Sequence, residues 1–123
     1  MNAQTERLTL TGPAGAIEAA RDAAAAEGGG APRGVAVIAH PHPLFGGTMD
    51  NKVVQTLARA FVASGWTAVR FNFRGVGATA GTYDEGRGEL DDLLAVIEQA
   101  APEGPLALAG FSFGAFVTSH ALA

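Results

Sequence analysis

Ser112 stands between two glycines, in the segment Gly110-Phe111-Ser112-Phe113-Gly114. An apolar run, Leu106–Ala109, precedes this segment, and a helix is expected from Phe113 to Leu122. A serine at such a strand-to-helix turn exposes its hydroxyl above the sheet, and the amino terminus of the helix directs free N–H groups at the same point. The pattern predicts that Ser112 attacks a carbonyl carbon and that the Phe113 N–H stabilises the oxyanion. The alternative is a glycine-bracketed junction with no chemistry.

Two other motifs could indicate a metal site and a dinucleotide-binding site, but we expect neither. His40 and His42 form a His-x-His pair, but no third ligand with metal-site spacing accompanies them. Gly75-Val76-Gly77 follows an apolar run and leads into more loop, whereas a dinucleotide-binding turn opens directly into a helix. We therefore predict neither a metal site nor a cofactor site.

Glu89 and Asp92 lie three residues apart on one face of a predicted helix. Paired carboxylates of this kind can perform acid and base catalysis, but the first turn of a helix attracts acidic residues in any protein. We expect these two side chains to form a solvated face or to anchor a loop.

The elements that must position Ser112 alternate between strands and helices. Three apolar runs predict strands covered on both faces: Val35–Ala39, Thr67–Phe73 and Leu106–Ala109. Between them, Val54, Leu57 and Phe61 form the stripe of one helix, with Thr48 or Asp50 as its N-cap and Gly65 at its end. Leu90, Leu93, Leu94 and Ile97 form the stripe of a second helix. The alternation predicts an α/β fold with a mostly parallel sheet flanked by helices.

The first thirty residues are less regular. Thr5–Thr11 and a strand that starts at Ala16–Ala19, joined by a turn at Gly12–Gly15, predict an antiparallel hairpin. Residues 19–33 contain an alanine tract and three consecutive glycines, which favour a flexible surface loop. A short helix over the alanines is the alternative, because alanine is the strongest helix former.

Composition excludes several classes of protein. The chain has 123 residues, 48% hydrophobic and 16% charged, as expected for one globular domain. A net charge of -4 with no run of Lys or Arg argues against nucleic-acid binding. No apolar stretch reaches the ~20 residues that span a bilayer, and the polar start lacks the apolar core of a signal peptide. We expect a cytoplasmic protein without membrane contact, and the sequence leaves its oligomeric state open.

Three segments, His40–Met49, Arg70–Gly77 and Gly110–Gly114, occur in the order and spacing of one family. Together they resemble small bacterial α/β-hydrolases, which are lidless serine hydrolases similar to dienelactone-hydrolase-type and acyl-peptidase-type domains. The resemblance covers residues 34–123 well and the hairpin loosely. It implies an α/β-hydrolase fold and hydrolysis of a carboxylic ester, thioester or related acyl bond in a small-molecule substrate, through an acyl-enzyme and without a cofactor.

The resemblance also implies roles for residues near the expected turn. The second oxyanion donor is expected in the loop after Val35–Ala39, where Pro41 and Pro43 have no N–H to donate. The backbone N–H of His42 aligns best with this role, and that of Leu44 is the alternative. The His40 side chain is expected to order this loop, and Arg74 to form a structural ion pair at the rim of the site.

A serine nucleophile also needs a base. In this fold an acid and then a histidine follow the serine, but the eleven residues after Ser112 contain neither Asp nor Glu. Their histidine, His120, lies about 12 Å along the helix axis, well beyond the ~3 Å reach of a general base. We therefore expect residues 1–123 to be the N-terminal part of one domain, with the acid and the histidine beyond Ala123. An inactive or partner-dependent half-domain and a nucleotide-binding α/β domain are the alternatives.

Overall fold

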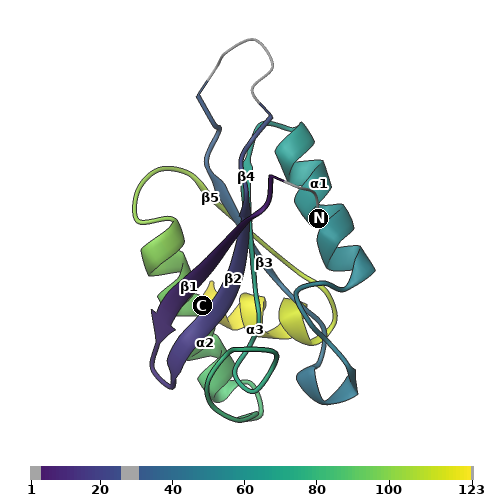
Figure 1. The fold of residues 1–123 in the computed structure, drawn as a ribbon, viewed down its shortest axis with the longest axis vertical. Helices are drawn as coiled ribbons and strands as arrows, with labels where there is room; N and C mark the ends of the chain where they lie inside the picture. The colour runs from purple at the N-terminus through teal and green to yellow at the C-terminus, as the bar shows by residue number, and fades with distance from the viewer. Residues whose placement is uncertain (1–3, 26–30, 123) are drawn as a thin grey trace.

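Strands and helices alternate along the chain in the computed structural model, which describes residues 4–25 and 31–122 (Figure 1). The elements are β1 (Glu6–Gly12), β2 (Gly15–Asp22), β3 (Val35–Ala39), the short 3-10 helix η2 (Pro43–Phe45), α1 (Lys52–Ala63), β4 (Thr67–Phe71), α2 (Arg87–Ala100), β5 (Leu106–Gly110) and α3 (Phe113–Ala121). The predicted alternation of strands and helices is confirmed.

The five strands form one sheet in the order β1-β2-β4-β3-β5. β3 lies in the middle of the parallel part, with Val37 opposite Val69 of β4 and Leu108 of β5. β1 and β2 form the expected antiparallel hairpin, and β2 joins β4, also antiparallel. Because β3, β4 and β5 are parallel, their carboxyl ends meet at one edge, the lower end of the molecule in Figure 1. The loops that follow these strands build the site.

Alternate residues of the strands point to opposite faces, so the sheet has a hydrophobic core on each side. Val37 and Val69 face α2 and α3, with Leu93 and Val117 in the same buried cluster. Their neighbours Ile38 and Ala68 point the other way and pack against α1. Figure 1 shows α1 and α2 on opposite sides of the sheet. The three layers agree with the expected α/β architecture.

The amino terminus of α1 differs from the expectation. The N-cap is Asn51, whose side-chain oxygen accepts hydrogen bonds from the Val53 and Val54 N–H groups at 2.9 and 3.3 Å. Thr48, one of the expected caps, instead accepts from the Asp50 N–H at 3.1 Å within the preceding turn. Assigning the cap to Thr48 or Asp50 was therefore wrong, because the loop turns once more before the helix begins.

The alanine tract also differs from the expectation. Residues 19–22 are neither loop nor helix; they are the second half of β2, with Ala19 opposite Phe71 and Ala20 opposite Arg70. Both alanines are fully buried. Pairing with strands on both sides and burial on both faces outweigh the helix preference of alanine. Residues 26–30 lie outside the described part of the chain, so the expected flexibility of this stretch stays a prediction.

Candidate active site

Ser112 occupies the tip of the turn between β5 and α3. Its backbone has φ 58° and ψ -116°, and only one other non-glycine residue in the described chain, Glu85, has a positive φ. Such a conformation costs on the order of 1–3 kcal/mol for a residue with a side chain, so the surrounding structure must impose it. The Ser112 side chain is exposed and forms no hydrogen bond with any described residue. The hydroxyl is thus held in the open at the amino end of a helix.

The two glycines of the motif allow this turn because there is no room for a side chain at either position. A Cβ on Gly114 would lie 2.2 Å from the Ala39 carbonyl oxygen, and one on Gly110 would lie 2.5 Å from the Gly114 carbonyl carbon. Both contacts are with backbone atoms, which cannot move aside without displacing β3 or α3. The glycines therefore bring the start of α3 directly against the end of β3.

The Phe113 N–H is available at the start of α3. Phe113 is the first residue of the helix, so its N–H has no partner within the helix, and none exists elsewhere in residues 4–25 or 31–122. The next amide, that of Gly114, instead closes the turn by donating to the Phe111 carbonyl at 3.1 Å. The Phe113 ring is buried against Phe73 and His42, with ring centroids 5.6 and 4.8 Å away.

The loop after β3 uses most of its own N–H groups. The His42 carbonyl accepts hydrogen bonds from Phe45 and Gly47 at 3.1 and 3.0 Å. The His42 imidazole accepts the Leu44 N–H at Nδ1, 3.1 Å away, and so caps η2. The backbone N–H of His42 itself has no partner in the part of the chain that the structure describes. Of the two expected donors, His42 is free and Leu44 is engaged.

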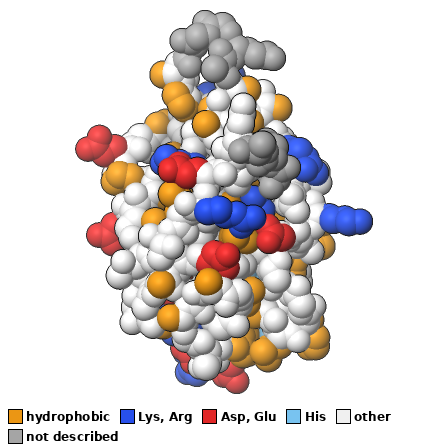
Figure 2. Space-filling view, in the orientation of Figure 1, with side chains coloured by type: hydrophobic (Ala, Val, Ile, Leu, Met, Phe, Trp, Pro, Cys, Tyr) orange, Lys and Arg blue, Asp and Glu red, His pale blue; other side chains and the backbone are white. Residues whose placement is uncertain are grey.

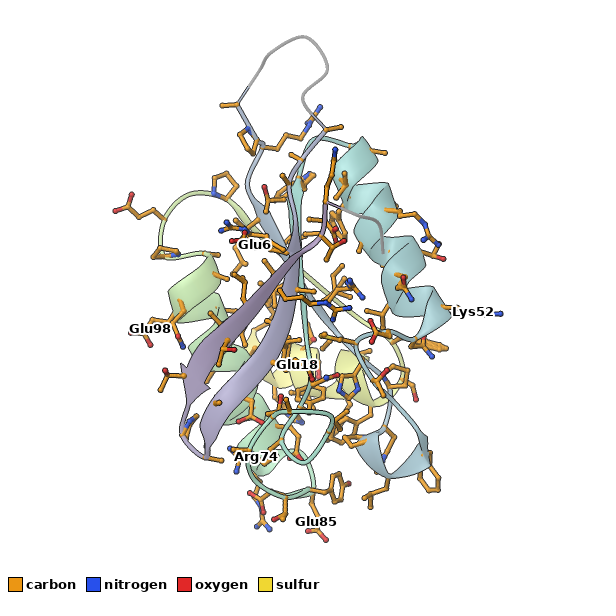
Figure 3. The ribbon with its side chains drawn as sticks, viewed as in Figure 1. Glu6, Glu18, Lys52, Arg74, Glu85 and Glu98 are labelled. Atoms are coloured by element: carbon orange, nitrogen blue, oxygen red, sulfur yellow. The ribbon has the colours of Figure 1, made fainter. Side chains whose placement is uncertain are left out.

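Both free amides belong to segments that lie side by side. The Phe111 N–H donates to the Ala39 carbonyl at 3.3 Å, which extends the pairing of β3 and β5 to the turn itself. Beyond that bond the chain continues to Ser112 and Phe113 on one strand and to His42 on the other. Figure 3 shows Arg74 and Glu85, from the loop after β4, at this same lower end of the molecule.

His40 is fully buried beneath the site. Its Nδ1 donates to the Pro41 carbonyl at 2.6 Å, and its Nε2 accepts the Phe73 N–H at 3.0 Å. Burial lowers the pKa of His40 from 6.5 to about 4, so the ring is neutral at pH 7. This arrangement confirms the expected structural role of His40. The rings of His40 and His42 have separate partners, and no group of three or more His, Cys, Asp or Glu among the described residues could hold a metal ion.

The expected ion pair of Arg74 is present. Its partner is the buried Asp92, whose Oδ1 accepts from Nη2 at 2.8 Å and whose Oδ2 accepts from Nε at 3.1 Å. Asp92 Oδ2 also accepts the Arg74 backbone N–H at 3.0 Å. The hydrogen bonds between the two side chains raise the pKa of Arg74. The pair fastens the loop after β4 to α2.

Glu89 anchors the other end of that loop. Its two oxygens accept the Asp84 and Gly86 N–H groups, each at 2.9 Å. Glu89 and Asp92 thus both anchor the loop between β4 and α2, which is one of the two roles expected for them.

Sequence reasoning missed Tyr83. Its hydroxyl lies 3.1 Å from His42 Nε2, and its ring lies 5.0 Å from the His42 ring and 5.9 Å from the Phe113 ring. In the sequence Tyr83 is a single aromatic residue within a glycine-rich loop, and this pattern does not indicate which residue its side chain contacts.

The surface beside the loop after β3 is apolar. Leu44 and Phe45, at the tip of this loop, are 63% and 85% exposed. Figure 2 shows hydrophobic side chains gathered at the lower right of the molecule, with charged side chains of both signs interspersed elsewhere on this face.

No helix among the described residues is long and apolar enough to cross a membrane.

Solved structures with the same fold define the class of this protein. An α/β serine hydrolase without a lid, from Xanthomonas campestris, superposes with a TM-score of 0.88 at 44% identity, over 98% of this chain and 56% of that one. An α/β serine hydrolase homologue from Coxiella burnetii gives 0.85 at 44% identity, over 98% and 57%. The fold is therefore that of the α/β-hydrolases, as the sequence resemblance implied.

The family follows from the sequence match. The chain belongs to the X-Pro dipeptidyl-peptidase (S15) family, whose profile matches residues 16–123. An uncharacterized protein of Rickettsia prowazekii is 40% identical over 115 residues, which are 90% of this chain and 47% of that protein. The chain thus spans about half the length of these relatives.

Proposed function

We propose that this chain carries the nucleophile and the oxyanion hole of a serine hydrolase that cleaves a carboxylic ester, thioester or related acyl bond. The observation that carries the proposal is the backbone of Ser112, which holds an unengaged hydroxyl at the exposed amino terminus of α3. A strained conformation at an exposed polar side chain is typical of a functional site.

The reaction would proceed through an acyl-enzyme. Ser112 Oγ attacks the carbonyl carbon of the substrate, and the carbonyl oxygen becomes an oxyanion. The Phe113 and His42 N–H groups donate to that oxyanion, since both lack other partners in the described chain. Collapse of the tetrahedral intermediate expels the alcohol or thiol, and water then attacks the ester on Ser112 to release the acid.

A base must take the proton of Ser112 Oγ during the attack and then give it to the departing alcohol or thiol. Phe113–Ala123 contains no Asp or Glu, and the ring of His120 packs against Phe116, with centroids 4.6 Å apart. We assign the base to a histidine paired with an acid in the portion of the domain that the relatives have beyond the matched half. No step requires a cofactor. We expect a small-molecule acyl substrate, no nucleic-acid partner and a cytoplasmic location.

A second candidate is hydrolysis of a peptide bond that follows an Xaa-Pro pair. The match to the X-Pro dipeptidyl-peptidase family favours it, and the same nucleophile and oxyanion donors would serve. The two candidates differ in the leaving group, an alcohol or thiol against an amine.

Labelling with a fluorophosphonate tests the nucleophile, and paired substrates test the leaving group. We expect the intact protein to form an adduct on the peptide that contains Ser112, and the Ser112→Ala variant to form none. We also expect the intact wild-type protein to hydrolyse short p-nitrophenyl esters far faster than an Xaa-Pro p-nitroanilide. The reverse preference would favour the peptidase. A folded protein that neither labels nor hydrolyses either substrate contradicts the proposal and favours an inactive half-domain, whereas stabilisation by a nucleotide favours a nucleotide-binding domain.

A further inference from the structure

The imidazole of His42 connects two loops that are far apart in sequence. Nδ1 accepts the Leu44 N–H at 3.1 Å, so this nitrogen carries no proton. In the neutral ring the proton must then sit on Nε2, which lies 3.1 Å from the Tyr83 hydroxyl oxygen. The Nε2–H therefore donates to Tyr83. The hydrogen bond to Leu44 and the hydrogen bond to Tyr83 select the same tautomer.

Tyr83 can hold the ring because its own loop is fastened. The Asp84 N–H donates to Glu89, and Arg74 is paired with the buried Asp92 at the other end of the loop. The Tyr83 ring also contacts Phe113, the residue whose N–H faces the proposed oxyanion. The hydroxyl thus has a fixed position relative to α3 as well as to α2.

The position of the His42 ring decides whether the Leu44 N–H is free. When Nδ1 accepts the Leu44 N–H, the loop winds tightly around His42, whose carbonyl accepts two further N–H groups. The His42 N–H is left without a partner in the described chain. If the ring turned away, the Leu44 N–H would lose its acceptor, and the loop would lose the hydrogen bond that caps η2.

We propose that Tyr83 is a positioning residue of the oxyanion hole, which holds the His42 imidazole so that the backbone N–H of His42, and not that of Leu44, faces the oxyanion. This inference rests on the proposed function. It predicts an effect on the transition state, in which the oxyanion exists, and little effect on binding of the neutral ester.

The substitution Tyr83→Phe tests the proposal, because it removes the hydroxyl and keeps the ring that packs against His42 and Phe113. With a p-nitrophenyl ester and the intact protein, we expect kcat to fall roughly five- to tenfold, the scale of one ordinary hydrogen bond, and KM to change little. Thr82→Val is the matched control: it removes a hydroxyl from the adjacent, exposed residue, and we expect wild-type kinetics.

A double-mutant cycle shows whether Tyr83 acts through His42. In His42→Asn the shorter side chain still offers an oxygen to the Leu44 N–H, but it has no atom that reaches Tyr83. We therefore expect Tyr83→Phe to lower kcat in the wild-type background and to have no further effect in the His42→Asn background. Equal effects of Tyr83→Phe in both backgrounds would overturn the proposal.

A spectroscopic signature separates positioning from general loss of structure. Imidazole nitrogen NMR should show His42 with a protonated Nε2 and a bare Nδ1 in the wild type, and a mixture of tautomers in Tyr83→Phe. Wild-type kcat in Tyr83→Phe, or a rise in KM alone, would show that Tyr83 does not position the hole. Neither result would touch the assignment of Ser112, which fluorophosphonate labelling tests separately.

Discussion

His40 Nε2 accepts the Phe73 N–H at 3.0 Å, and this buried hydrogen bond joins the loop after β3 to the loop after β4. The bond requires an unprotonated Nε2, while Nδ1 donates to the Pro41 carbonyl. A buried neutral histidine is therefore part of the support of both loops. His40 is far more exposed to water in the unfolded chain, so its pKa differs between the folded and unfolded states. The free energy of unfolding therefore depends on pH.

The sign of that dependence follows from the lowered pKa of His40, which is about 4 in the fold against 6.5 for an ordinary histidine. Between these values the unfolded chain binds a proton that the folded chain does not. The free energy of unfolding should therefore fall as the pH falls from 6.5 to 4, by roughly 3 kcal/mol over the whole window. Urea unfolding at pH 7 and at pH 4.5 measures this decrease in the free energy of unfolding.

A His40→Gln variant provides the reference for this measurement. Carboxyl groups also titrate at the acidic end, but the variant shares them, so the difference between the two proteins isolates His40. We expect His40→Gln to have a lower free energy of unfolding than the wild type at pH 7. We expect this difference between the two proteins to be smaller at pH 4.5. A gap that stays constant with pH would show that His40 is not held neutral.

The buried ion pair of Arg74 should be far more important for stability than an exposed one nearby. Arg74→Gln leaves Asp92, which is 1% exposed, as an unpaired charge, and we expect a loss of roughly 3–5 kcal/mol. Arg87→Gln is the matched control, since Arg87 and Glu85 form a 3.6 Å pair with both side chains more than 75% exposed. We expect that variant to lose less than about 1 kcal/mol. Similar unfolding midpoints in urea for the two variants would contradict the assigned role of the Arg74 pair.

Gly114→Ala tests why the turn at Ser112 needs glycine. The new Cβ would meet the Ala39 carbonyl oxygen at 2.2 Å, so we expect a loss of roughly 3 kcal/mol or more and a displaced start of α3. Gly104→Ala is the comparison: Gly104 has φ 84° but nothing within 4 Å of its Cβ direction, so only backbone strain remains, on the order of 1 kcal/mol. Thermal unfolding of both variants would reveal the difference. Equal losses would mean that the close approach to β3 is not what the glycine provides.

The turn at Ser112 could be predicted from sequence because its determinants are local. Gly110 and Gly114 lie within two residues of the serine, and the apolar strand before them and the helix after them have their own periodicity. The mistakes came where the answer depended on distant partners. The alanines of β2 are strand because β1 and β4 pair with them on both sides, and alanine alone favours a helix. Several polar residues near the start of α1 could each cap it, and the path of the loop selects Asn51.

The finer parts of the site could not be read from the sequence. The choice between the His42 and Leu44 amides depends on a side chain that folds back onto its own loop. The contact between His42 and Tyr83 joins residues 41 positions apart, and it depends on the path of the loop after β4, which α2 anchors. The sequence identified the residues that can donate, and the closed loop determines which of them is free.

The structure of the intact protein after reaction with a fluorophosphonate tests the central claim most directly. We predict a covalent bond between phosphorus and Ser112 Oγ. One phosphonyl oxygen should lie about 2.7–3.1 Å from the backbone nitrogens of Phe113 and His42, with the Leu44 N–H still bound to His42 Nδ1. An adduct on another residue, or a phosphonyl oxygen that points to solvent away from both nitrogens, would contradict the assignment of Ser112 and its oxyanion hole.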